Sequence, residues 1–369
     1  TITLPASAEA GDQIVIVDYA RTWGTNNVTI DSNGLNYQGD ADTYTVEYTT
    51  DGQALNIVYA DSTKGWLPLE DDVVADEPAI TPTQKAIFGF GKATSVTAIT
   101  NLVNSSGVVA SDTSGVGTAR EVISASGYGG DKAIFAYGAA SGKVSLSNLV
   151  SNSGVVASDT TGVGTARSGA AGVMYGVTKA IFAYGTTGSM TAVSNLVSSS
   201  GVVATDVSGV GTARADVAAC GYGGDKGIFG YGDNGIGVSY VSISNLVNNS
   251  GVIGADVTGV GTIRSRLAAA GYGGDKGIFG YGTGEGGDGS MTNLVSNVGV
   301  IASDVSGVGT ARKFLAATGY GGDKAIFGYG ATTLSMTNLV NSSGVVASDV
   351  SGVGTGRNAL AACGYSNSA

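Results

Sequence analysis

The residues of this chain that could do chemistry are acids and bases, because the 369-residue sequence contains no histidine. Without histidine, Ser-His and Cys-His catalytic pairs and most metal centres are excluded. Glycoside hydrolysis needs a pair of carboxylates, and the acids outside the repeat described below form no recognisable constellation: Glu121, Asp216, Asp233, Glu285 and Asp288. The sequence therefore predicts no enzyme, no cofactor and no metal site.

One aspartate and one arginine recur together in the pattern Asp-x-x-Gly-Val-Gly-Thr-x-Arg. The pairs are Asp112/Arg120, Asp159/Arg167, Asp206/Arg214, Asp256/Arg264, Asp304/Arg312 and Asp349/Arg357. They could form a ring of charged ligands around an axis. The favoured interpretation is structural, an Asx turn and an ion pair that brace the crossing between neighbouring units, because every copy carries both residues whereas a site is normally built by breaking a repeat.

These pairs lie within a unit of about 47 residues that fills the chain from Lys85 onward. Its anchor, Lys-[Ala/Gly]-Ile-Phe-[Gly/Ala]-[Tyr/Phe]-Gly, begins at Lys85, Lys132, Lys179, Lys226, Lys276 and Lys324. Short apolar β-prone segments and Gly, Asn and Ser turns at this period are typical of propeller blades, and no segment has the apolar spacing of a helix. We expect an all-β fold in which residues 81–369 form a six-bladed β-propeller.

Each unit should contain four short strands. The last unit ends just after its small-residue strand, at 359–365, whereas the first unit begins without such a strand. We therefore expect the C-terminal strand to complete the blade that begins at Lys85 and to close the ring, which would remove exposed sheet edges.

The variable segments that follow the anchors should share one face with the Asp…Arg crossings, while tight turns occupy the opposite face. Loops on a rigid scaffold usually carry recognition. The contact candidates on this face are Asn234, Tyr240, Glu285 and Asp288, and the many Thr, Ser and Asn residues suit sugar hydroxyls. Glu285 and Asp288 could also serve a Ca²⁺ loop, although their generic spacing favours a solvated loop.

The unit resembles the Kelch repeat in its arginine before the inner strand and in its apolar strand that ends in a glycine pair. Here that pair is Gly-Tyr-Gly, as at 230–232, and the tryptophan usual in Kelch repeats is missing from every copy. The resemblance implies a propeller, and the departure weakens any implication of Kelch-type partner binding.

Residues 1–80 differ in composition from the rest. They hold 14 acids and only two bases, Arg21 and Lys64, for a net charge of −12, whereas the rest of the chain carries +1; both tryptophans and all four prolines lie before residue 83. We expect a first domain over 1–80, with Trp23 and Trp66 as core or interface anchors. Its strands should be 1–4, 13–18, 27–30, 43–49, 55–59 and 65–69.

This first domain resembles a small β-module of tailed-phage fibres and virion appendages. The shared pattern is Gly-Asp before an apolar strand, Asn-x-Val-Thr-Ile, an Asn-Gly turn and a closing strand with Gly-Trp, as in residues 11–17, 26–34 and 55–69. The resemblance implies a virion structural protein, a tail fibre or capsid-attached fibre, that assembles with other virion proteins through residues 1–80 and forms homotrimers. Attachment to a host-surface glycan would be its task. A secreted or cell-surface bacterial lectin-like protein is the alternative.

Two further classes of partner are not expected. No basic footprint suits nucleic acid, and no apolar run is long enough to span a membrane. The two cysteines, Cys220 and Cys363, occupy the same position in the third and sixth copies. These copies would be opposed across a ring, too far apart for a disulfide, so we expect both thiols to be free and buried.

Overall fold

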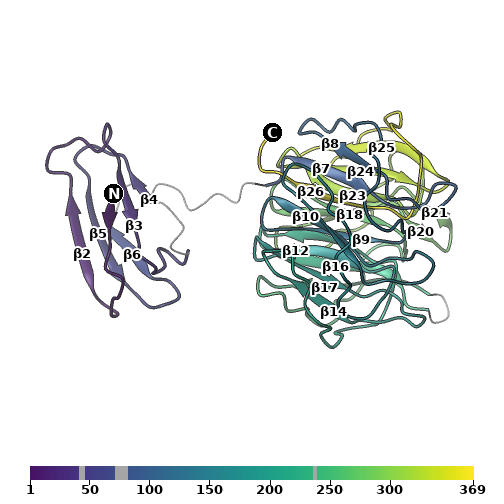
Figure 1. Cartoon of the computed structure of the whole chain (residues 1–369), viewed down its shortest axis with the longest axis horizontal. Coiled ribbons are helices and arrows are strands. Elements are labelled where there is room, and N and C mark those ends of the chain that lie inside the picture. Colours follow the sequence, from purple (N-terminus) through teal and green to yellow (C-terminus); the bar gives the residue numbers. More distant parts are fainter. Residues whose placement is uncertain (41–45, 71–81, 236–238) are drawn as a thin grey trace. The chain divides into compact units, whose positions relative to one another are not determined.

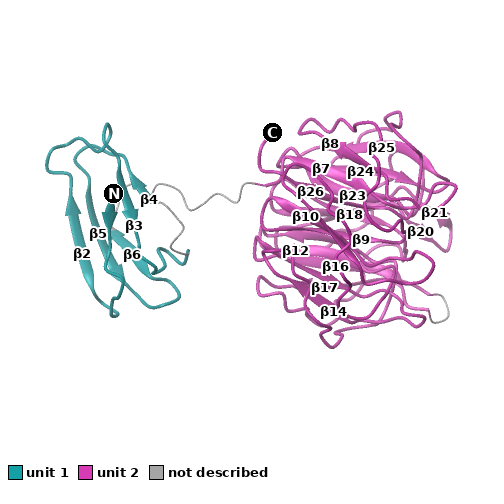
Figure 2. Cartoon of the chain, viewed as in Figure 1, with its two compact units in different colours: residues 1–79 teal, residues 80–369 magenta. Residues whose placement is uncertain are grey.

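The computed structural model divides into two compact units, Thr1–Ala79 and Ile80–Ala369 (Figure 2). It describes residues 1–40, 46–70, 82–235 and 239–369. The all-β prediction is confirmed, since the described residues form strands β1 to β26 and no helix (Figure 1). The domain boundary expected after residue 80 falls outside the described residues.

Unit 1 is built from two three-stranded sheets, and its strands lie close to the predicted segments. One sheet has the order β1 (Ile2–Thr3), β3 (Val28–Asp31), β4 (Val46–Tyr48), and the other has the order β2 (Gln13–Val17), β5 (Ala54–Tyr59), β6 (Trp66–Glu70). Residues 43–45 of the predicted fourth strand lie outside the described residues. All pairings are antiparallel except that of β1 with β3.

The core of unit 1 follows from alternation along its strands. In β5, Leu55, Ile57 and Tyr59 are buried whereas the intervening side chains are not, which is the pattern of a sheet with one covered face. Trp66 and Trp23 are buried in the same core, and the Trp66 ring meets Tyr59 edge-on at a centroid distance of 5.5 Å. Both tryptophans are therefore core anchors, as predicted.

Unit 2 repeats one three-stranded antiparallel sheet six times. In each sheet the anchor strand is central, with a small-residue strand on one side and an Asn-bearing strand on the other. The sheets are β26 (Ala361–Tyr365), β7 (Lys85–Gly89), β8 (Thr100–Val103); β9 (Ser124–Tyr128), β10 (Lys132–Ala136), β11 (Ser147–Val150); β12 (Ala171–Tyr175), β13 (Lys179–Ala183), β14 (Ser194–Val197); β15 (Ala218–Tyr222), β16 (Lys226–Asp233), β17 (Tyr240–Val247); β18 (Ala268–Tyr272), β19 (Lys276–Gly280), β22 (Thr292–Val295); and β23 (Ala316–Tyr320), β24 (Lys324–Gly330), β25 (Leu334–Val340).

Isolated bridges, such as Val103 with Val109 and Thr100 with Thr113, extend each sheet beyond its third strand. One copy also holds a short hairpin, β20 (Thr283–Gly284) with β21 (Gly287–Asp288). The predicted fourth strand of each unit is therefore present only as these bridged residues.

The first of these sheets joins the two ends of unit 2. Strand β26 pairs antiparallel with β7, and Tyr365 lies opposite Lys85. Strands β26 and β7 are consequently neighbours in space although nearly the whole repeat array separates them in sequence (Figure 1).

The sheets pack face to face because the anchor strand is apolar on both sides. Ile87 and Phe88 are completely buried. The glycine that follows phenylalanine in four anchors makes room for a neighbouring ring: a Cβ atom on Gly89 would lie 2.7 Å from Phe135, and one on Gly328 would lie 2.8 Å from Phe88. The last anchor therefore packs on the first one in the way that the first packs on the second.

Both cysteines are free and buried, as the repeat position predicts. Cys220 packs beside Ile278 and Val295, and Cys363 packs beside Ile87 and Ala133. Burial raises the pKa of the Cys220 thiol to about 12 and raises that of Cys363 as well. Both side chains therefore act as small apolar residues of the core.

Candidate functional site

The repeated arginines and aspartates pair between copies and not within one copy, which corrects the pairing expected from the sequence. Arg120 Nη1 lies 3.7 Å from Asp159 Oδ1, and Arg264 Nη1 lies 3.6 Å from Asp304 Oδ1. The segment that carries each arginine leaves one sheet and enters the next, so the arginine reaches the aspartate of the sheet ahead. The interaction is a brace between neighbouring sheets.

The brace holds a buried guanidinium on several sides. Arg214 Nε donates to Tyr231 O at 2.8 Å, Nη2 donates to Asn245 Oδ1 at 2.7 Å, and Cζ lies 4.1 Å from the ring centroid of Tyr184. Each of the six arginines stacks in this way on the aromatic residue of an anchor. Burial lowers the pKa of Arg120 to about 10, which still leaves it charged at neutral pH.

The aspartate of the brace is occupied by protein donors. Asp159 accepts the N–H of Thr118 at 3.0 Å, the hydroxyl of Thr118 at 2.6 Å and Asn148 Nδ2 at 2.9 Å. Although desolvation opposes them, these hydrogen bonds hold the pKa of Asp159 below its ordinary value. The repeated aspartates therefore support the structural interpretation and not a ring of ligands.

The same contacts join the last copy to the first. Thr355 donates its hydroxyl to Asp112 at 2.6 Å and its N–H at 3.0 Å, and Arg357 Nε donates to Phe90 O at 2.8 Å. Residues 267 positions apart are thus bonded as neighbouring copies are bonded elsewhere.

Two residues beyond each arginine, six residues make a cycle of backbone hydrogen bonds that we call the axial ring. The N–H of Val122 donates to Ala359 O, and each later member donates to the one before it until Ala359 donates to Phe314 O; the six distances lie between 2.8 and 3.2 Å. Its members are Val122, Gly169, Asp216, Arg266, Phe314 and Ala359.

All six members of the axial ring have a left-handed backbone, with φ from 51° at Val122 to 66° at Gly169. This conformation is costly for side chains other than Gly, Asn and Asp. It persists because the hydrogen-bond cycle fixes the peptide groups. The side chains are different in every copy, although the arginine two residues earlier never changes.

Three members of the axial ring form a polar and aromatic cluster. Arg266 Nε donates to Asp216 Oδ2 at 3.1 Å, and Arg266 Cζ lies 4.9 Å from the ring centroid of Phe314. Burial raises the pKa of Asp216, while Arg266 opposes the shift. Among the described residues, none accepts a hydrogen bond from the terminal nitrogens of Arg266, so these donors are available to a ligand.

The axial ring lines a shallow cavity of about 70 Å³ together with the apolar residue that follows each member. The variable segments lie next to it, because bridges join the residue after five of the six arginines to the start of a variable segment, as between Glu121 and Ala139 and between Ser265 and Thr283. We call the axial ring and these variable segments the loop face.

The four residues predicted as contacts lie in two variable segments of the loop face. Asn234 follows β16 and Tyr240 begins β17, with residues 236–238 between them outside the described residues. Glu285 is exposed between β20 and β21. The Asp288 carboxylate lies 3.1 Å from Lys313 Nζ.

The described residues contain no group of three His, Cys, Asp or Glu side chains that could hold a metal ion. Glu285 and Asp288 therefore belong to no such group among the described residues.

Three of the five acids outside the repeat are paired on the loop face. Besides Asp216 with Arg266 and Asp288 with Lys313, Glu121 lies 3.6 Å from Lys92. Sequence reasoning found no constellation among these acids and missed Arg266 and Phe314. The signal that could have found them is the alignment of the six copies on their arginines, which shows a different residue at the second position in every copy.

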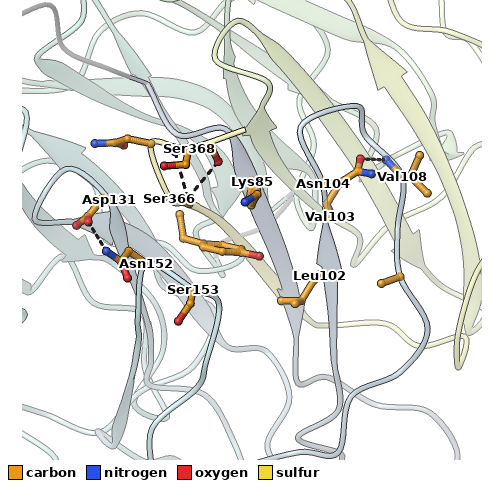
Figure 3. Close-up of a pocket in the computed structure, with 13 residues that line it drawn as sticks. Lys85, Leu102, Val103, Asn104, Val108, Asp131, Asn152, Ser153, Ser366 and Ser368 are labelled. Carbon is orange, nitrogen blue, oxygen red and sulfur yellow. Dashed lines mark hydrogen bonds between the residues drawn. The ribbon is translucent and has the colours of Figure 1, made fainter.

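A larger cavity of about 730 Å³ lies where β26 meets β7, among the tight turns on the opposite side from the loop face (Figure 3). Its polar lining includes Lys85, Asn104, Asp131 and Asn152. No motif in the sequence marks this cavity, because it is formed by residues from both ends of unit 2.

Comparison with protein-family models and with curated proteins finds no match to this chain. The described residues include no helix that could cross a membrane. The function is therefore argued from the geometry of the molecule.

Proposed function

We propose that unit 2 is a six-bladed, Kelch-like β-propeller closed by β26, and that its loop face binds a ligand. The observation that carries the proposal is the axial ring, a rigid cycle in which every copy supplies a different side chain. The pairing of β26 with β7 and the brace from Thr355 to Asp112 support closure. Catalysis is not proposed, since no pair of carboxylates faces a substrate-sized cavity at this ring.

We further propose that the chain is a virion structural protein, a tail fibre or capsid-attached fibre, and that the loop face attaches the particle to a host-surface glycan. An aromatic ring beside an ion pair, within Thr-, Ser- and Asn-rich segments, suits sugars, since a ring face can stack on Phe314 and hydroxyls can bond to Asp216 and Arg266. The phage-like pattern of residues 1–80 supports the virion setting.

Unit 1 would serve assembly with other virion proteins and formation of a homotrimer. Exposed apolar side chains support this role: in the sheet that contains β2 and β6, Val15, Val17 and Leu69 are more than half exposed. Exposed apolar side chains gathered on one sheet favour an interaction surface. Mass measurement of the full chain in solution tests the trimer, and a monomer at all concentrations would contradict it.

A glycan array probed with the full chain tests recognition. We expect a restricted set of glycans to bind, and we expect Phe314→Val and Arg266→Gln to lose that binding while the melting temperature changes little. Val155→Ser, an exposed change near the opposite face, is the control and should bind as the unchanged chain does. Absence of binding to any glycan would refute attachment through sugars. A structural role on the virion without a glycan ligand would then be the remaining proposal.

Imaging of purified particles with an antibody against the chain tests the virion assignment. Labelling of a tail fibre or of the head is expected. Detection of the chain only on bacterial cells would instead support the lectin-like alternative.

A further inference from the structure

The cavity at the junction of β26 and β7 differs from every other junction of unit 2 in how its strands are joined. Elsewhere a Tyr-Gly-Gly-Asp turn, or its Tyr-Gly-Val-Thr variant, links the inner strand directly to the anchor lysine. Here Tyr365 and Lys85 face each other across two strands that no turn connects. The space that a turn would fill becomes part of a cavity of about 730 Å³, a volume typical of small-molecule sites.

The missing turn also removes a carboxylate. In four copies the anchor lysine pairs with the aspartate directly before it; the Nζ–Oδ1 distances are 2.6 Å at Lys132, 2.7 Å at Lys226, 2.9 Å at Lys276 and 3.1 Å at Lys324. Lys85 follows Gln84, whose side chain donates to Pro82 O. The ammonium group of Lys85 consequently lines the cavity without a hydrogen bond or ion pair to a described residue.

The acid nearest to this site is already neutralised. Asp131 lies on the cavity wall, but its carboxylate accepts hydrogen bonds from Lys132 Nζ at 2.6 Å and from Asn152 Nδ2 at 3.0 Å. Figure 3 shows Lys85 between this pair on one side and Asn104 on the other. Among the described residues that line the cavity, Lys85 therefore carries the one charged side chain besides Asp131.

Asn104 adds a fixed donor. Its Oδ1 accepts the N–H groups of Ser106 and Val108, both at 3.0 Å, which orients the amide. Its Nδ2 has no partner among the described residues. Leu102 and Val108 supply apolar surface. The hydroxyl of Ser366, also on the lining, is hydrogen-bonded to the backbone of Ser368.

We propose that this cavity is a second binding site, separate from the loop face, which takes a carboxylate-bearing saccharide residue of the uronic acid type. The carboxylate bonds to Lys85 Nζ and Asn104 Nδ2, and the sugar ring lies against Leu102 and Val108. The lining offers a cation and an amide donor beside a small apolar wall. These groups suit a carboxylate-bearing sugar better than a neutral sugar.

Titration of the full chain with glucuronate, followed by calorimetry or by chemical shifts, tests the site. Glucose and acetate are the comparison probes. We expect glucuronate to bind at least about tenfold more tightly than either one, because a lost charge-assisted bond costs about that factor. Acetate binding as tightly as glucuronate would overturn the saccharide assignment, and absence of glucuronate binding would overturn the site.

Two variants locate the binding within the chain. Lys85→Gln should weaken glucuronate binding at least about tenfold, whereas Lys179→Gln, which changes the other anchor lysine that no aspartate precedes, should leave it unchanged. Asn104→Ser also removes a ligand donor, yet it keeps the turn, because serine already caps the same turn at Ser151. Unchanged binding in both Lys85→Gln and Asn104→Ser would refute the site, and neither result bears on glycan binding by the loop face.

Discussion

The brace and the axial ring lie two residues apart in sequence, and the six copies treat them in opposite ways. Every copy keeps the arginine and the threonine two residues before it, and every copy keeps the aspartate that the arginine and threonine of the preceding copy contact. No two copies share the side chain at the ring position, although all six share its backbone conformation. The repeat therefore holds constant the contacts that join the sheets and varies the side chains of the axial ring, for which we propose a ligand.

Removal of one braced arginine should have the largest effect on stability. Arg214→Met leaves Asn245 Oδ1 and Tyr231 O without their donor in a buried setting, and each buried acceptor left unsatisfied costs about 1–3 kcal/mol. Denaturant titration of the full chain should show this decrease in the free energy of unfolding.

Arg167→Met is the matched comparison. Arg167 Nε has no partner, and its two longer hydrogen bonds, to Thr165 O and Phe182 O, measure 3.3 and 3.4 Å. We expect a smaller loss than for Arg214→Met. Equal losses would mean that stacking on the aromatic ring, and not the hydrogen bonds, supplies most of the stabilisation.

Acid should loosen all braces together. Desolvation tends to raise the pKa of Asp112, Asp206 and Asp349, but hydrogen bonds from threonine and asparagine hold each below its ordinary value. A depressed folded-state pKa contributes stability that is complete above the unfolded value, near pH 4, and is lost as the pH falls through the folded value. The melting temperature of unit 2, measured in the full chain between pH 6 and pH 2, should decrease mainly below pH 4.

Asp206→Asn identifies the source of this decline. The variant should be less stable at neutral pH and should lose less stability between pH 4 and pH 2 than the unchanged chain. A parallel pH profile in the variant would contradict the assignment to the braces.

The sequence predicts the all-β fold and the strands of the repeat because its pattern recurs six times, so that each copy checks the others. Trp66 and the two cysteines are also predicted correctly, since apolar burial follows from residue type and repeat position. Neighbours across copies are harder to predict. Asp112 and Arg120 look like a pair because they are close in sequence, yet the crossing carries Arg120 toward Asp159.

The axial cluster and the Lys85 cavity escape sequence reasoning for a related reason. Asp216, Arg266 and Phe314 come from three successive copies, and only a closed hydrogen-bond cycle brings them together. Lys85 looks like every other anchor lysine until the strand opposite it is known. Sites made of residues from several copies have no signature within one copy.

The smallest expected effects come from the axial ring itself. Gly169 shares the left-handed backbone with five residues that have side chains, so the backbone alone does not require glycine. A Cβ atom there would lie 2.8 Å from Asp216 Oδ1, and Asp216 would have to move away from Arg266. We expect Gly169→Ala to cost about 1–2 kcal/mol of stability, because alanine is strained in a left-handed backbone, and to weaken the glycan binding that we propose for the loop face. Ala359→Gly is the reverse change at another position of the axial ring. It should change neither the stability nor the glycan binding by much, since relief of backbone strain offsets the greater entropy of the unfolded chain. A Gly169→Ala variant that binds normally while Asp216→Asn does not would show that the position of the carboxylate is less important than its charge.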